Sequence, residues 1–332
     1  VLDAGNGVVH SPPLMWAEAL EALLRQLRES GINLASIEAV SGSGQQHGTV
    51  YLNQSAAGVL GGLRSDLSLT DQLNGVFSRP TAPVWMDTST RVQCDEIETG
   101  VGGRQRLLEL TGNTAFERFS GPQIRKFAQQ EPAAYERTTT ICLVSSFVAS
   151  LLAGRVVPVD AGDGSGTNLM DIGQQRWSQD ALAATAPDLG QRLLPIIKAD
   201  SIVGSISPYW VDRYGFNPTC NVLPFSGDNP CSLIGLGLVE PGKLALSLGT
   251  SDTFFACMDK VRISSTGEGA LFASPDGVHY MALICFLNGS LAREAVRDQY
   301  NLDWEGFAAG LRQTNPGNDE GLMLPYFDAE IV

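Results

Sequence analysis

The sequence predicts an α/β protein built from two domains. Its 332 residues exceed what one hydrophobic core usually organises, which favours two units. In the first half, a helical segment is followed by a short apolar segment that runs into a glycine turn, an order typical of α/β domains. A second pattern of strands and helices begins after about residue 200, and we place the domain boundary close to residue 225.

The composition excludes several classes of protein. With 43% hydrophobic and 17% charged residues, the chain is typical of a soluble globular protein, and its apolar segments are too short for a membrane-spanning helix. The formal net charge of −14 argues against nucleic acid as a partner, because phosphate binding needs basic patches. Binding of a small anionic ligand is still compatible with this charge, if backbone amides or a metal supply the positive field.

The cysteines and the first residue give information on the cellular compartment and on the start of the protein. The six cysteines are widely spaced and form no Cys-x-x-Cys pair, so we expect buried thiols of a reducing compartment and a cytoplasmic protein. The sequence starts at Val1, and no signal-peptide pattern follows. We expect it to begin inside a longer protein, and a removed targeting segment stays open.

The first elements are an amphipathic helix and two strands. Pro12 and Pro13 favour a helix start, and Gly31 stands where a helix end is expected. Between them, apolar side chains recur at helical spacing: Leu14, Ala17, Leu20, Leu24 and Leu27. A strand over 37–40 then leads into a glycine turn at 41–44, and a second strand is expected over 49–52.

The middle of the chain is predicted to be mainly helical. Residues 53–80 are polar and turn-rich, and a strand at 84–86 precedes a helix that Asp87 and Thr88 would cap. Further helices are expected at 104–110, 124–130, 145–152, 179–186 and 189–196, with a glycine-rich loop at 162–168. The helix at 145–152 carries no charge and should be buried.

The last third opens with a strand at 222–225 and a helix that starts at Pro230. Two apolar strands at 244–248 and 253–257 flank the turn 249–252 and predict a β-hairpin. A strand at 279–286 and a helix at 288–300 follow.

Asp228 is the first candidate for chemistry. It follows a strand and a glycine, and the carboxyl ends of strands are where α/β domains bind ligands. Its carboxylate could act as a general base and take the proton from an alcohol. The alternative is a helix N-cap, since Asp before Asn-Pro is a good helix start, and residue physics alone favours the cap.

Two glycine turns and one arginine are further candidates. The turn at 247–252 could form a phosphate-binding nest of backbone amides, although a plain hairpin turn is the commoner explanation. The turn at 41–48 carries Gln46 and His47, which could bind sugar hydroxyls, but a lone histidine is more often structural. The turn at 41–48 lacks the Gly-x-Gly-x-x-Gly spacing of dinucleotide-binding sites and the lysine of a P-loop, so neither kind of site is indicated. Arg118 could bind a substrate oxygen or pair with a surface carboxylate, with neither favoured.

Taken in order, these motifs resemble the FGGY family of carbohydrate kinases, and within it the animal members that phosphorylate D-xylulose. The resemblance covers nearly the whole chain and is strong because weak motifs recur in one order. The segments that carry it are 41–48, 83–90, 116–119, 163–166, 225–230, 247–252, 279–283 and 288–291.

The resemblance implies a two-domain, actin-like ATPase fold of ribonuclease H type, with a sugar-binding domain over 1–225 and a nucleotide-binding domain from 226 to 332. ATP and Mg²⁺ would be needed to convert D-xylulose into D-xylulose 5-phosphate, with Asp228 as catalytic base. The sugar site it implies consists of Gln46, His47, Trp85, Arg118, Asp228 and Asn229. Gly249, Thr250 and Ser251 would face the transferred phosphate, and Trp304 would flank the nucleotide.

The resemblance also implies that both domains are incomplete, because family members open with a strand and phosphate loop and close with an adenosine site that this sequence lacks. We therefore expect weak turnover or none from this chain alone. The alternatives are a kinase of ribulose, glycerol or gluconate, or a non-catalytic sugar-binding fragment; Gln45, Gln46 and His47 favour xylulose. Nucleic-acid and membrane partners are not expected, and a homodimer stays open.

Overall fold

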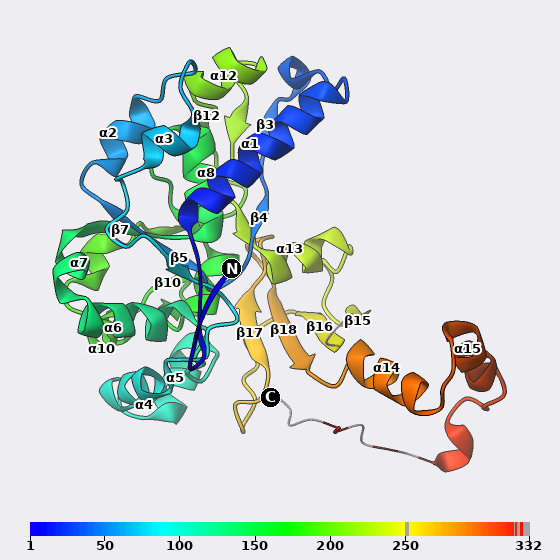
Figure 1. The fold of residues 1–332 in the computed structure, drawn as a ribbon. Helices are drawn as coiled ribbons and strands as arrows, with labels where there is room; N and C mark the ends of the chain where they lie inside the picture. The colour runs from blue at the N-terminus through cyan, green and yellow to red at the C-terminus, as the bar shows by residue number, and fades with distance from the viewer. Residues whose placement is uncertain (250–251, 322, 324–325, 328–332) are drawn as a thin grey trace.

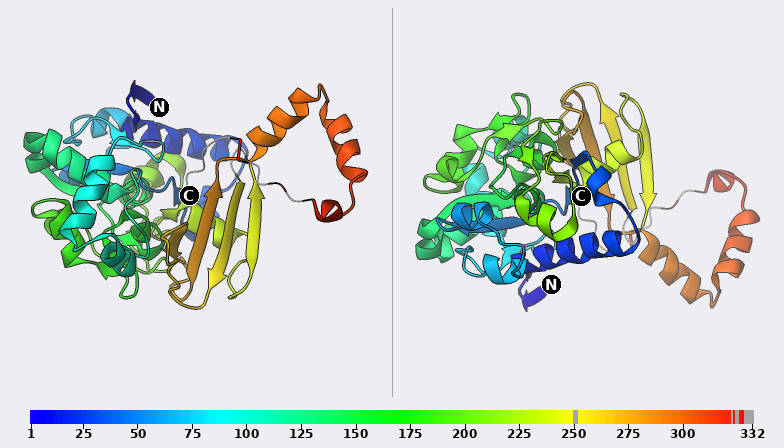
Figure 2. Two further views of the ribbon diagram at one scale, coloured as in Figure 1. Left: turned by 90° about the horizontal axis from the view of Figure 1, so that it is seen from below. Right: turned by 90° about the horizontal axis from the view of Figure 1, so that it is seen from above.

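The computed structural model describes residues 1–249, 252–321, 323 and 326–327. Most of the chain up to α13 forms a first body of helices and short sheets, and a four-stranded antiparallel sheet packs against it (Figure 1). Two further helices, α14 and α15, extend away from both in every view (Figure 2). The predicted α/β class is confirmed.

The helices of the first body vary widely in length. They are α1 (Pro13–Glu29), α2 (Ala56–Gly61), α3 (Leu69–Leu73), α4 (Arg91–Gly100), α5 (Arg104–Thr111), α6 (Ser120–Gln130), α7 (Pro132–Arg137), α8 (Val144–Ala153), α9 (Ala161–Gly164), α10 (Gln179–Thr185), α11 (Leu189–Arg192), α12 (Pro208–Tyr214) and α13 (Asp228–Gly235). Beyond the sheet follow α14 (Ser290–Gln299) and α15 (Trp304–Arg312). None of the helices in the described part of the chain has the length and apolar character needed to cross a membrane.

The strands of the first body are short and pair in small groups. They are β1 (Leu2–Gly5), β2 (Val8–Ser11), β3 (Ala39–Val40), β4 (Ser43–Gly44), β5 (Thr49–Asn53), β6 (Ala82–Pro83), β7 (Thr138–Leu143), β8 (Val159–Asp160), β9 (Met170–Asp171), β10 (Arg176–Trp177), β11 (Ile196–Ile197), β12 (Gly204–Ser205), β13 (Asn221–Val222) and β14 (Ser226–Gly227). The pairs β3–β13, β4–β14 and β8–β11 are parallel, and the others are antiparallel.

The core of the first body is built on α1, α8 and the β5–β7 pair. Helix α1 buries Ala17, Leu20 and Leu24, as its apolar spacing predicts. Helix α8, which carries no charge, buries Phe147 completely, and Trp210 of α12 packs into the same cluster. Burying large apolar side chains is the main favourable term in folding, so these elements form the scaffold that holds the turns between them.

The second sheet has the order β15–β16–β18–β17, with β15 (Leu244–Leu248), β16 (Asp252–Met258), β17 (Ala270–Ala273) and β18 (Tyr280–Phe286). It packs on the first body through a cluster that joins Phe255 and Phe272 to Phe119. The buried Asn113 adds a polar link, because its amide group donates to the Leu271 carbonyl and accepts from the Leu271 N–H, both at 2.9 Å. The sheet is therefore hydrogen-bonded to the first body through β17.

Most sequence predictions for the main elements are confirmed, and three are wrong. The segment predicted as a loop at 162–168 contains α9 and a 3₁₀ helix at Ser165–Thr167, and the helix predicted at 189–196 ends at Arg192, before strand β11. The hairpin of β15 and β16, the helices α1, α4 and α8 and the strands β5 and β18 lie where the patterns place them, with small differences in bounds. The strand predicted at 84–86 is wrong: the strand β6 is Ala82–Pro83, and residues 85 and 86 form a turn. The chain turns there because the fully buried Asp87 side chain accepts the Val9 N–H at 3.0 Å and the Ser89 N–H at 3.0 Å.

Gly44 shows how tightly the turn after β4 packs. A Cβ atom at this position would lie 2.6 Å from the backbone nitrogen of Ser145 and 2.8 Å from its Cα, which are not free to move aside. The glycine lets the turn lie directly on the start of α8.

We expect Gly44→Ala to lower the free energy of unfolding by about 1–3 kcal/mol, because the added methyl group overpacks a backbone contact. The matched control is Gly58→Ala in α2, where nothing lies within 4 Å of the new Cβ; that variant should be neutral or stabilised by up to about 1 kcal/mol. Urea unfolding of both variants measures the difference. Equal effects would contradict the packing account.

Candidate active site

Parallel pairing of β4 with β14 brings two distant turns together. Ser43 lies opposite Ser226, and Gly44 lies opposite Gly227. Since both strands run in the same direction, the turns that leave their carboxyl ends emerge side by side. One turn carries Gln46 and His47, and the other carries Asp228 and Asn229; the Gln46 N–H donates to Asp228 Oδ1 at 3.2 Å across 182 residues of sequence.

A cavity of about 290 Å³ opens at this junction, between the first body and the second sheet. All six residues predicted for the sugar site line it: Gln46, His47, Trp85, Arg118, Asp228 and Asn229. The apolar part of its wall comes from Phe116, Phe119, Ala270, Phe272 and Leu283, with Thr253, Gly269 and Cys285 completing the lining. A small site with apolar walls and a few convergent polar groups is typical of small-molecule binding.

Asp228 supplies a carboxylate to the lining of the cavity. It is the first residue of α13, and the N-cap is Gly227, so the helix-cap interpretation is wrong by one position. Its Oδ1 accepts from the backbone N–H groups of Gln46 and Asn229, while no residue of the described chain donates to Oδ2. Crowding by protein atoms raises the pKa of Asp228, although the cavity leaves the side chain open to solvent. This carboxylate has one fixed oxygen and one available to a ligand.

Gln46 and Asn229 form a rigid amide pair beside that carboxylate. The Asn229 side-chain N–H donates to the Gln46 carbonyl oxygen at 2.9 Å. Gln46 is almost completely buried, so its side chain cannot turn away into water. The pair therefore fixes the distance between the two turns.

His47 is held in one orientation and kept neutral. Its backbone φ of +72° is uncommon for a residue with a side chain, and its ring stacks on Phe119 with centroids 4.4 Å apart. Its Nδ1 lies 2.7 Å from the Gly166 carbonyl, which only accepts, so Nδ1 carries the proton of this bond. Burial, with help from Arg118, lowers the pKa of His47 to about 3. Nε2 is therefore an acceptor for a ligand hydroxyl.

Arg118 supplies the positive charge of the cavity. Its side chain is half-buried over the Phe116 ring, 5.8 Å from the ring centroid, and no carboxylate in the described chain lies within ion-pair distance of it. Burial lowers the pKa of Arg118, but a guanidinium stays protonated in proteins. Of the two roles open from sequence, the structure leaves the guanidinium available to a ligand.

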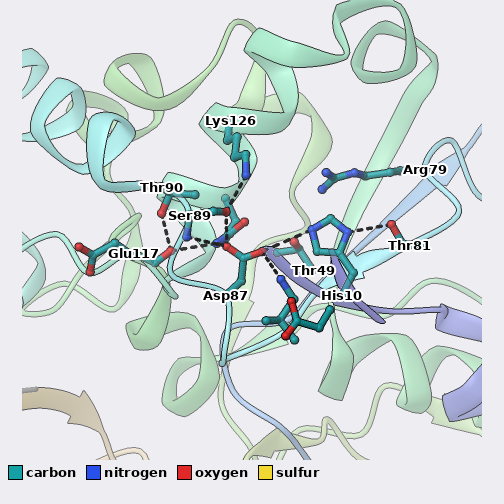
Figure 3. Close-up of polar contacts among 12 residues, drawn as sticks. His10, Thr49, Arg79, Thr81, Asp87, Ser89, Thr90, Glu117 and Lys126 are labelled. Atoms are coloured by element: carbon teal, nitrogen blue, oxygen red, sulfur yellow. Dashed lines mark hydrogen bonds and ion pairs between the residues drawn. The ribbon is translucent and has the colours of Figure 1, made fainter. Parts of the chain in front are cut away.

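Asp87 is linked by hydrogen bonds to the segment that precedes Arg118; Figure 3 shows Asp87 beside Ser89, Thr90 and Glu117. The Gln123 amide donates both to Asp87 Oδ1 at 2.8 Å and to the Glu117 carbonyl at 3.0 Å. Thr90 donates to the same carbonyl at 2.5 Å. Because Glu117 immediately precedes Arg118, these bonds fix the backbone position from which the Arg118 side chain extends.

Sequence reasoning missed this role, because it assigned Asp87 to a helix cap. The actual N-cap of α4 is Thr90, and the buried Asp87 lies three positions earlier. The adjacent hydroxyls of Ser89 and Thr90 were the only local signal, and hydroxyls are common before any helix.

The predicted nucleotide side is described only in part. The Gly249 carbonyl follows β15 and accepts from the Ser290 N–H at 2.9 Å, so the start of α14 lies beside this turn. Thr250 and Ser251 lie outside the described residues. Trp304 begins α15, where the Arg297 guanidinium lies 4.4 Å from its ring centroid, and it is not among the residues that line the cavity. The nucleotide roles of these residues stay predictions.

The described side chains offer only part of what Mg²⁺ requires of a binding site. Magnesium binds about six oxygens in octahedral geometry, several from water or phosphate. Within the described part of the chain, no group of three or more His, Cys, Asp or Glu side chains is arranged to hold a metal ion. The described side chains therefore do not form a complete metal site by themselves, and Mg²⁺ stays a prediction.

Known proteins resemble this chain in sequence and in fold. Residues 66–235 match the N-terminal domain of the FGGY family of carbohydrate kinases. A xylulose kinase from Rattus norvegicus is 47% identical over 322 residues, which cover 96% of this chain and 59% of that protein. The chain thus spans about three-fifths of the length of the curated relatives it matches.

Solved structures confirm the predicted actin-like fold. A xylulose kinase from Rhodospirillum rubrum superposes with a TM-score of 0.82 at 18% identity, over 99% of this chain and 64% of that one. A gluconate kinase from Lactobacillus acidophilus superposes with a TM-score of 0.80 at 17% identity, over 99% of this chain and 62% of that one. The two neighbours act on different sugars, so the shared fold does not identify a substrate.

The neutral state of His47 predicts a pH dependence of stability. The unfolded histidine takes up a proton near pH 6.5, whereas the folded one stays neutral down to about pH 3. The unfolded state therefore binds the extra proton between these values, so His47 makes the fold less stable as the pH falls through that window.

We expect the slope of unfolding free energy against pH, between pH 4.5 and 6, to be smaller in His47→Gln by about 1.4 kcal/mol per pH unit. Urea unfolding across this range measures both slopes. Parallel slopes in the two proteins would show that His47 is charged in the folded state. A lower stability of the variant at every pH does not affect the comparison, since only the slopes are compared.

Proposed function

The chain belongs to the FGGY family of carbohydrate kinases, and from this membership we propose that it binds D-xylulose in the cavity and transfers the γ-phosphoryl group of ATP to it. The products are D-xylulose 5-phosphate and ADP. The relatives named xylulose kinase support the choice of sugar.

The observation that carries this proposal is the composition of one cavity. It brings together a carboxylate with a free oxygen, a neutral imidazole, a guanidinium and a fixed amide pair. A polyhydroxylated ligand offers both donors and acceptors, and these groups supply partners for both. The aromatic wall then packs against the carbon skeleton of the sugar.

Asp228 acts as the general base in this proposal. Its Oδ2 takes the proton of the hydroxyl at carbon 5 while that oxygen forms a bond to the γ-phosphorus of ATP. The bond between the γ-phosphorus and the bridging oxygen breaks, and ADP leaves with the bonding electrons. A raised pKa makes Asp228 a stronger base than an ordinary aspartate, provided that it is ionised at the working pH.

The other cavity residues bind and orient the sugar. Nε2 of His47 accepts a hydrogen bond from one hydroxyl, and the Arg118 guanidinium donates to another oxygen. Asn229 keeps its place through Gln46, so its free carbonyl oxygen can accept as well. Orientation of this kind accounts for much of the rate enhancement in phosphoryl transfer, which needs no protein nucleophile.

The nucleotide part of the proposal comes from the family. ATP would approach from the side of the turn after β15, where Gly249 lies, and Trp304 is proposed to flank it. Mg²⁺, when bound, would neutralise phosphate charge. The two-domain division near residue 225 is likewise proposed from the family pattern.

One observation favours a second substrate. Arg118 has no carboxylate partner in the described part of the chain, and the carboxylate of gluconate would pair with a guanidinium. Titration calorimetry with D-xylulose, D-ribulose, glycerol and gluconate separates the candidates. D-xylulose should bind most tightly, and tightest binding of gluconate would reassign the substrate.

We expect Asp228→Asn to lower kcat for D-xylulose by about 10²–10⁴-fold, because the amide cannot take the proton. The dissociation constant for the sugar should change far less, since the amide keeps an oxygen and the shape. ADP release by the protein that carries this chain gives kcat, and titration calorimetry gives the binding.

The matched control is Asp95→Asn, whose carboxylate pairs with Arg91 on the exposed side of α4 and should leave both quantities unchanged. Full turnover by Asp228→Asn would exclude this residue as the base. Sugar binding without turnover in the unmodified protein would instead favour a non-catalytic sugar-binding role.

A further inference from the structure

Two buried carboxyl groups lie close to Asp228, which lines the cavity. Asp160 stands at the end of β8, Asp163 lies in α9, and Asp228 begins α13. Asp160 and Asp163 are completely buried, and neither belongs to the sugar-binding set. Burial is the largest cause of the raised pKa of Asp163, and the negative charges of Asp160 and Asp228 raise it further, so the three groups interact electrostatically.

Asp160 receives enough hydrogen bonds to be an anion. Its oxygens accept from the Gly162 N–H at 2.9 Å, the Asp163 N–H at 3.1 Å and the Ser226 hydroxyl at 2.8 Å. Three donors compensate a buried carboxylate for much of its lost hydration. Burial still raises the pKa of Asp160 to about 6, so it is ionised near neutral pH.

Asp163 accepts fewer hydrogen bonds than Asp160. The Ser145 hydroxyl donates to its Oδ2, whereas Oδ1 is buried and has no partner among the described residues. That oxygen faces Gly227, where a Cβ atom would lie only 3.0 Å from it. The same Cβ would lie 2.4 Å from Cγ of Gln46, so Asp163, Gln46 and the backbone before Asp228 meet at one point.

No positive charge in the described part of the chain compensates this group of acids. In the described chain, no Lys, Arg or His nitrogen lies within ion-pair distance of Asp160, Asp163 or Asp228. The titratable neighbours that face Asp163 are the other two carboxyls and the Cys231 thiol of α13, whose pKa is raised to about 11 by burial and by these carboxyls, so the thiol is neutral. Elements α8 and β17, which pack beside them, contribute no titratable group here.

Three uncompensated anions at this spacing are unfavourable, and a buried carboxyl without partners takes up a proton instead. The number of hydrogen-bond donors around each carboxyl identifies the one that is protonated. Asp160 accepts from three donors. Asp228 accepts from two backbone N–H groups and, at 3.5 Å, from the Asn229 side-chain amide, and it also has access to solvent, whereas Asp163 accepts from one donor. Burial and the negative charge of Asp160 accordingly raise the pKa of Asp163 well above its usual range.

We propose that Asp163 is a positioning residue that lies behind Asp228 as a neutral carboxylic acid, and that its neutrality keeps Asp228 ionised as the base. A charge on Asp163 would favour the protonated form of Asp228, which cannot accept a proton from the sugar. This inference rests on the proposed function for the role of Asp228, whereas the protonation of Asp163 stands independently.

The protonation itself is tested by infrared spectroscopy of the chain at pH 7.5, with ¹³C-labelled aspartate. The unmodified protein should show the C=O stretching band of a protonated aspartic acid, and the band should shift with the label. Asp163→Asn should lose the band, and the surface control Asp95→Asn should keep it. An absent band, or one that persists in Asp163→Asn, would overturn the proposal.

A second measurement does not depend on any variant being active. With a neutral Asp163, the folded state binds one more proton than the unfolded state above pH 6.5. The contribution of Asp163 should therefore lower the folding equilibrium constant by up to about tenfold for each pH unit of increase. The interval from pH 6.5 to 7.5 lies above the pKa of about 6 of Asp160. Asp163→Asn should remove this component of the slope, and an unchanged slope would contradict a protonated Asp163.

The effect on the base is tested by turnover with D-xylulose and ATP as a function of pH. Asp163→Asn should keep kcat/KM within about threefold of the unmodified protein and extend activity to higher pH, because an amide cannot ionise. Asp163→Ala leaves the Ser145 hydroxyl unpaired and should lose at least tenfold. If a folded Asp163→Asn is as inactive as Asp163→Ala, the neutral acid is the wrong assignment.

The two proposals fail separately. The infrared band and the stability slope need neither sugar nor ATP, so a protein that shows both but does not phosphorylate D-xylulose contradicts the proposed function alone. A protein that phosphorylates D-xylulose but shows no protonated carboxyl at pH 7.5 contradicts the inference about Asp163 alone.

Discussion

The parallel pairing of β4 with β14 is the constraint on which the site depends. Only two residues of each strand take part, yet their register places the turn of Gln46 and His47 against the turn of Asp228 and Asn229. The pairing needs glycine on both strands. A side chain at Gly44 would meet the backbone of α8, and one at Gly227 would meet Gln46 and Asp163. Residues with no part in binding therefore determine whether the binding residues meet.

Charge is distributed around this junction by hydrogen-bond donors rather than by ion pairs. The chain carries a formal net charge of −14, and the cavity contains one guanidinium. Backbone amides and hydroxyls hold Asp160 and Asp228, and the Gly166 carbonyl fixes the neutral tautomer of His47. Backbone donors and acceptors are fixed by the fold, so the site keeps its geometry before any ligand arrives.

Local patterns in the sequence predict the long elements well. The apolar spacing in α1, the two apolar runs of the β15–β16 hairpin and the uncharged α8 each follow from residues close together in the chain. The cavity could not be predicted in this way, because it depends on pairing between residues that are 182 positions apart. Asp228 illustrates the limit: its neighbours indicated a helix start, while the family resemblance placed it with His47 and Arg118. Asp87 and Asp163 were missed because nothing local distinguishes a buried hub from a cap or a turn.

The central claim is that the two turns and the Arg118 wall form one sugar site. The most direct test is a crystal structure of the chain grown with D-xylulose. The account predicts a sugar in the cavity, with one hydroxyl on Asp228 Oδ2, another on His47 Nε2 and an oxygen on the Arg118 guanidinium. A sugar bound elsewhere, or one in the cavity that leaves both Asp228 and His47 without a contact, would contradict it.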